Sequence, residues 1–165
     1  MVGKDSFAAT MMSLLQEKLK TLFVSRAQRK KEADEYAAVC VEAWRIARDT
    51  AAELRQLAGQ CRAALEGGSF AYDSAKVAAI RDAITTLKGK NCPPELKLTI
   101  SDLEAMIAWS TLCEQKMSAP AVSAADRGAA VAEAEEKRSH AEQVEAQLVV
   151  NARLATAEAD KFVGW

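Results

Sequence analysis

Apolar residues recur every three or four positions through most of this chain, which is the pattern of amphipathic helices packed side by side. Neither glycine nor proline occurs between Asp5 and Ala58, and the next helix-breaking stretch is EGGSF at 66–70. The sequence therefore predicts one helix from about residue 5 to residue 65, roughly 90 Å long at 1.5 Å per residue.

Two apolar stripes run along this predicted helix. The residues of the first stripe are Phe7, Met11, Leu15, Leu19 and Leu22. The second stripe keeps the spacing of a heptad repeat and contains Ala33, Tyr36, Cys40, Ala43, Ala47, Ala51, Leu54, Ala58, Cys61 and Leu65. The segment SRAQRKKE at 25–32 interrupts the apolar pattern between them. Both stripes need neighbouring helices as cover.

Three more helices are predicted after the break. The second covers about 73–88, where Val77, Ile80, Ile84 and Leu87 share one face. The third is expected at 101–118, because SDLE has the form of a capping box with Ser101 as the N-cap. The last covers about 123–162, and its thin apolar stripe contains Ala125, Ala129, Ala132, Val144, Leu148, Ala155 and Phe162.

These elements predict an all-α fold with a single domain over 1–165. We expect an elongated antiparallel helical bundle in three layers, with a long helix, two shorter helices that both run back along it, and a second long helix that runs in the direction of the first. The heptad spacing favours packing like that of a coiled coil.

The charge balance limits the partners of such a bundle. Lysine and arginine number 22 against 23 aspartate and glutamate, so the formal net charge is -1. A chain this neutral has no overall field that would attract DNA, RNA or an anionic membrane. No apolar run approaches the roughly 18 to 20 residues that span a bilayer, so no transmembrane segment is predicted.

The sequence gives little support for catalysis. His140 is the only histidine and falls among charged residues, and no C-x-x-C, P-loop, G-x-G-x-x-G or G-x-S-x-G motif occurs. A di-iron bundle would need two E-x-x-H pairs, and the chain has none. We therefore expect no enzyme activity, no catalytic residues, no cofactor and no metal ligands.

A basic cluster lies between the two stripes. Its members are Arg26, Arg29, Lys30 and Lys31. It either grips nucleic acid or an acidic partner, or is a solvated stretch that Glu32, Asp34 and Glu35 neutralise. Because no aromatic residue lies between Phe23 and Tyr36, stacking on bases is missing and nucleic acid is the less favoured partner.

The four cysteines decide the expected compartment. Cys40 and Cys61 are 21 positions apart, as are Cys92 and Cys113. In an antiparallel hairpin, Cys40 with Cys113 and Cys61 with Cys92 would be compatible disulfides, although loop lengths fit the first pair better. The alternative is four buried free thiols. Paired cysteines would indicate an extracellular or surface protein, and free ones a cytoplasmic protein.

In composition and layout, the long Ala/Glu/Lys helices with sparse cysteines (Cys40, Cys61, Cys113) are similar to the helical-bundle ectodomains of trypanosome surface glycoproteins and receptors. The resemblance covers no sequence motif. It implies a host-facing binding module whose site lies at the exposed end of the bundle.

Three functions follow from these patterns. The first is a non-enzymatic scaffold that binds a protein partner or its own copies through the first stripe, with the basic cluster as rim. The second is an extracellular surface or receptor-like domain locked by disulfides. The third is an adaptor that binds nucleic acid or an acidic partner through residues 26–31.

Overall fold

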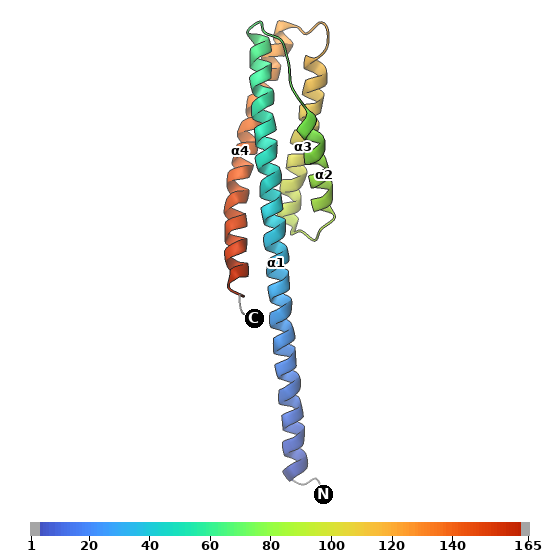
Figure 1. Cartoon of the computed structure of the whole chain (residues 1–165), viewed down its shortest axis with the longest axis vertical. Coiled ribbons are helices and arrows are strands. Elements are labelled where there is room, and N and C mark those ends of the chain that lie inside the picture. Colours follow the sequence, from blue (N-terminus) through green and yellow to red (C-terminus); the bar gives the residue numbers. More distant parts are fainter. Residues whose placement is uncertain (1–3, 163–165) are drawn as a thin grey trace.

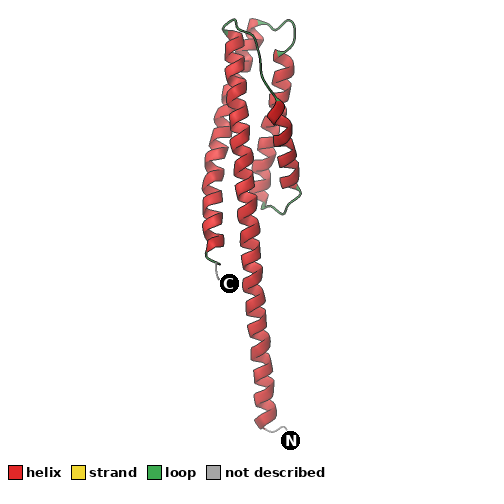
Figure 2. Ribbon diagram, viewed as in Figure 1, coloured by secondary structure: helices red, strands yellow, loops and turns green. Residues whose placement is uncertain are grey.

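The chain folds entirely into helices over the part that the structure describes. This computed structural model describes residues 4–162, apart from the side chains of residues 4–6, 21, 23 and 24. The helices are α1 (Lys4–Leu65), α2 (Ala75–Lys88), α3 (Pro94–Met117) and α4 (Ala124–Asp160), and no strand occurs among the described residues (Figure 2). The predicted all-α bundle, with a long helix, two shorter helices and a long helix, is confirmed.

The helices alternate in direction along the bundle. From the end of α1, the chain turns back through 66–74 into α2, reverses again into α3, and returns through α4 (Figure 1). We expected α2 and α3 to run the same way and α4 to run parallel to α1, and both expectations are wrong (Figure 1). The connection at 89–93 is a short turn, and short connections make consecutive helices antiparallel neighbours. As a result α3 runs parallel to α1.

Helix α1 contacts each of the other three helices. Its most extensive partner is α4. Both sides of this pairing are built from small residues, which allow two helices to approach closely. On α1 the fully buried alanines are Ala43, Ala47, Ala51 and Ala58, and on α4 the buried alanines are Ala130, Ala134, Ala141, Ala152, Ala155 and Ala159.

Ion pairs between α1 and α4 fix the axial register of the two helices. Arg55 Nε donates to Glu142 Oε1 at 3.0 Å, and Arg62 pairs with Glu135 at 3.2 Å. Arg138 bonds both of these glutamates from within α4. The Arg138 and Arg62 guanidinium groups lower the pKa of Glu135.

Larger side chains fill the other half of the core. Helices α2 and α3 bring Ile84, Leu87, Ile100, Leu103 and Ile107, which are almost completely buried together with Leu54 and Leu57 of α1. Helix α4 adds one large fully buried residue, Leu148. The hydrophobic core therefore lies chiefly between α1 and the α2–α3 hairpin, whereas α4 attaches through alanines.

The third helix begins at Pro94 rather than at the predicted Ser101. Proline suits the first helical position because its fixed φ is helical and its missing N–H is not needed there. Leu96 and Ile100 are buried on the same face as Leu103 and Ile107, which extends the stripe by two turns. Ser101 lies inside the helix and is exposed.

The predicted stripe of the last helix was only partly correct. Ser123 is the N-cap, as expected, and its side chain accepts from the Asp126 N–H at 3.1 Å. Leu148 and Ala155 are buried, but Ala125, Ala129 and Ala132 are exposed, and the helix ends at Asp160. Alanines occur on every face of α4, so alanine spacing alone did not show which face packs.

Candidate functional site

The first half of α1 extends far beyond the bundle (Figure 1). We call residues 4–32 the α1 overhang, which is about 44 Å long at 1.5 Å per residue. The first buried residue among the described side chains of α1 is Ala37, and every side chain described between 7 and 22 is exposed. Within the described chain, no other element covers this segment.

The overhang carries a run of large apolar side chains. They are between 44% and 68% exposed, and they are Phe7, Met11, Met12, Leu14, Leu15, Leu19 and Leu22. Soluble proteins seldom leave such a continuous apolar surface uncovered unless it binds something. The five residues predicted from the sequence are thus brought together on one exposed helix.

Met12 and Leu14 were not among the residues predicted from the sequence. The signal that could have found Met12 is the heptad register of the bundle. The a and d positions of α1 in the core are Cys40, Ala43, Ala47, Thr50, Leu54, Leu57, Cys61 and Ala64, all of them buried. Counting back from them in steps of seven gives Leu22, Leu19, Leu15 and Met12 in the same register.

The apolar stripe of the overhang is therefore in phase with the seam that packs inside the bundle. Two positions interrupt it, Arg26 at an a position and Arg29 at a d position. They separate the packed seam from the exposed one. A helix lying on the overhang would thus continue the line of the bundle.

The basic cluster is largely neutralised along the helix. Lys30 Nζ pairs with Asp34 at 2.9 Å, and Lys31 approaches Glu35 at 4.0 Å. Such pairs one turn apart are the solvated arrangement expected from the sequence. They reduce the positive charge that this segment offers to a phosphate backbone.

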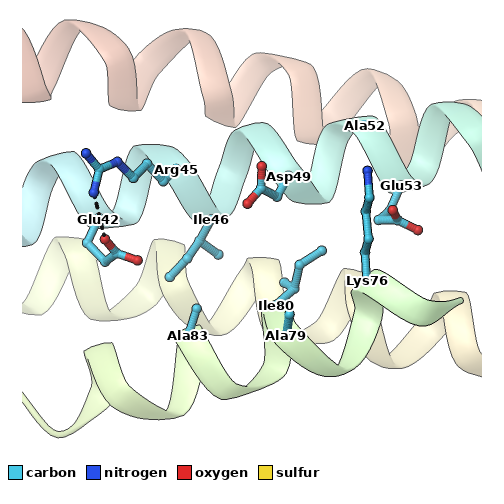
Figure 3. Close-up of a pocket in the computed structure, with 10 residues that line it drawn as sticks. All are labelled: Glu42, Arg45, Ile46, Asp49, Ala52, Glu53, Lys76, Ala79, Ile80 and Ala83. Atoms are coloured by element: carbon cyan, nitrogen blue, oxygen red, sulfur yellow. Dashed lines mark hydrogen bonds and ion pairs between the residues drawn. The ribbon is translucent and has the colours of Figure 1, made fainter.

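A pocket of about 270 Å³ lies between α1 and α2 (Figure 3). Charged side chains surround it, among them Glu42, Asp49 and Lys76, while Ile46 and Ile80 supply apolar surface. Its volume is below the roughly 300 to 1,000 Å³ typical of ligand pockets. Glu42 is already paired with Arg45 at 3.5 Å.

One carboxylate of this pocket is buried and has a structural partner. The Tyr72 hydroxyl donates to Glu53 Oε2 at 2.7 Å, and Glu53 is 3% exposed. Burial and this bond raise the pKa of Tyr72. Tyr72 belongs to the connection at 66–74, so the bond ties that segment to α1. The pocket is better explained by this attachment than by substrate binding.

The four cysteines are free and buried, and the two that lie in contact are not a pair considered from the sequence. Cys61 Sγ lies 3.8 Å from Cys113 Sγ, whereas the disulfides considered from the sequence would join Cys40 with Cys113 and Cys61 with Cys92. Cys92 lies close enough to Cys40 to contribute to the raised pKa of Cys40, which is chiefly due to burial. The structure brings together neither of the pairs considered from the sequence, and the four cysteines are free, as in the alternative.

The direction of α3 explains the new pairing. Between parallel segments, residues at one level differ by a constant number of positions, and 52 positions separate Cys61 from Cys113 and also Cys40 from Cys92. The equal spacing of 21 residues thus places one pair at each end of the bundle. The contact with Cys113 and burial raise the pKa of Cys61, while the bond from Cys61 lowers the pKa of Cys113.

Oxidation should cross-link Cys61 with Cys113. With oxidised glutathione as the oxidant, we expect the lower-pKa Cys113 thiolate to attack first, which breaks the glutathione disulfide, forms a mixed disulfide on Cys113 and releases one reduced glutathione. Cys61 then displaces the second glutathione from Cys113. The two sulfurs then need to close from 3.8 Å to about 2.05 Å. Digestion and mass spectrometry should recover the Cys61–Cys113 peptide pair, and Cys61→Ser should abolish it. A Cys40–Cys113 pair as the main product would contradict the arrangement.

The described residues offer neither a metal site nor a membrane-spanning helix. No group of three or more His, Cys, Asp or Glu side chains among them could hold a metal ion. His140 instead bridges α4 to α3, with Nε2 2.9 Å from Asp102 Oδ2. In the part of the chain that the structure describes, no helix is both long and apolar enough to cross a bilayer.

The α1 overhang is thus the surface with the strongest signal for binding. Comparisons of the chain with protein-family models, with curated proteins and with solved structures found no match.

Proposed function

We propose that this chain is a non-enzymatic scaffold that binds a protein partner through the α1 overhang. The observation that carries the proposal is the run of seven large apolar side chains left exposed on one unaccompanied helix. Burying a side chain such as leucine gains about 1.5 to 3 kcal/mol. Covering this run would release enough free energy to support a stable complex.

The lone helix itself supports the proposal. Most helical stability in proteins comes from packing an apolar face rather than from intrinsic propensity. The overhang has such a face but has no neighbour in the described chain. A partner helix laid on it would supply the missing packing and use the i, i+3, i+4 anchors of helix-in-groove recognition.

A photo-cross-linking residue at position 15 tests this function. With Leu15→p-benzoylphenylalanine in the cells that make the protein, illumination should join the overhang to a protein. The matched control is Leu112→p-benzoylphenylalanine, because Leu112 is 64% exposed but lies on α3, away from the overhang. An adduct at position 15 and none at 112 supports the proposal. No protein adduct at 15, or equal yields at both positions, contradicts it.

The disulfide-locked surface domain is a second candidate, which the 3.8 Å contact of Cys61 with Cys113 favours. One bridge there and one between Cys40 and Cys92 would fasten both ends of the α2–α3 hairpin to α1. Mass spectrometry of protein purified from its native source without reductant tests this candidate. Four alkylatable thiols would contradict it.

A further inference from the structure

We infer that the partner of the α1 overhang is the overhang of a second copy of this chain, bound antiparallel. This inference rests on the proposed function and names the occupant of the same surface. It is carried by three features of the described residues: the free length of the seam, its continuity with the bundle seam, and the positions of two arginines.

The free seam is as long as the overhang itself. At the level of Glu32 to Tyr36, the turn with Asn91 and Cys92 lies against α1 on one side. At the same level the end of α4, near Glu158, lies on another side. A partner helix packed along the seam from residue 4 would meet these two segments at that level and could extend no further. A second overhang has the length to fill this space.

The register follows from the a and d positions. In an antiparallel pair, a residues face d residues of the other helix. Met12 and Leu19 are at a, and Leu15 and Leu22 are at d. The arrangement that matches all four places Met12 opposite Leu22 and Leu15 opposite Leu19. The four central layers of this interface are then apolar on both sides, while Met11 lies at its edge and Phe7 and Leu14 fall outside it.

The arginines favour the antiparallel direction. In a parallel pair, Arg26 and Arg29 would each lie opposite their own counterparts at the seam, and like charges at such positions repel. In the antiparallel register, Arg26 lies opposite Ala8. The overlap then runs from residue 4 to residue 30, and the two bundles stand at opposite ends of the shared rod, where they do not compete for space.

Self-association is the first test. At micromolar concentration, light scattering should give twice the 17.8 kDa of one chain. Leu15→Glu places a charge at the centre of the interface in both copies and should weaken self-association by about 100-fold, equivalent to two decades in Kd. Ser13→Glu adds the same charge on the outer face of the overhang, where Ser13 is exposed, and should leave the dimer intact.

Directed cross-linking tests the direction. Met12→Cys and Leu22→Cys should each give no covalent dimer alone, but should form one when the two variants are mixed and oxidised. The wild-type chain controls for its own buried thiols. Covalent dimers from each variant alone would overturn the antiparallel arrangement. Self-association would be overturned if the wild-type chain stays monomeric and the mixed Met12→Cys and Leu22→Cys variants form no cross-link.

The photo-cross-link at position 15 separates the two claims. An adduct with twice the mass of one chain supports both. An adduct with a different protein overturns the second copy as occupant but leaves the scaffold function standing. The absence of any adduct contradicts the function itself.

Discussion

Replacing Leu103 by alanine is expected to lower the free energy of unfolding by about 3 to 4 kcal/mol. Leu103 is completely buried on α3, and α3 contacts all three other helices. Truncation removes the burial of the side chain and leaves a cavity among surrounding residues that relax only in part. Urea unfolding followed by tryptophan fluorescence measures the change, since Trp44 and Trp109 are half-buried in the bundle.

Leu112→Ala is the matched control on the same helix. Leu112 is 64% exposed, so the same truncation should change stability by no more than about 0.5 kcal/mol. Both variants should be measured at one protein concentration, because self-association would contribute to apparent stability. Equal losses for Leu103→Ala and Leu112→Ala would contradict the position of the core.

Ala141→Leu is expected to destabilise the bundle by about 3 kcal/mol, the upper end of the range for overpacking. Ala141 is fully buried beside Glu142, which pairs with Arg55 of α1. Alanines on both helices allow the close approach, so a longer side chain has no space unless α4 moves away from α1. The ordinary preference for a larger apolar residue in a core is reversed at this interface.

Ala132→Leu controls for the intrinsic helix propensity of leucine in α4. Ala132 is exposed, and we expect a change within about 0.5 kcal/mol. Thermal unfolding followed by circular dichroism compares the two variants. An Ala141→Leu protein as stable as the wild type would mean that α1 and α4 lie further apart than described.

Much of the fold could be predicted because its signals are local. The absence of glycine and proline between Asp5 and Ala58 predicted the long α1, and Ser123 marked the start of α4. The start of α3 could not be placed as well, because a prolyl pair both breaks one helix and begins the next. At Pro94 the second of these effects prevails, since the following stripe through Leu96 is buried.

The relations between helices were harder to predict. The direction of α3 depends on the five-residue turn at 89–93. That direction in turn determines that Cys61 meets Cys113. The packed face of α4 was uncertain because alanine occurs on all its sides. Only Leu148, its single large fully buried residue, identified that face clearly.

The candidate site was predictable in part. The stripe from Phe7 to Leu22 was found from spacing, but its exposure was not, because exposure depends on where α4 ends. In the structure α4 ends at Asp160, level with the beginning of the packed part of α1. Had α4 been longer, the same leucines would have been ordinary core.

The native thiols at the two ends of the bundle can report local opening of each end. Cys40 and Cys92 lie where α1 leaves the bundle, and Cys61 and Cys113 lie at the far end, all shielded from solvent. Under native conditions an alkylating reagent can reach each pair only when that end loosens. Labelling rates at the two ends would therefore report which part of the rod opens first, without any introduced probe.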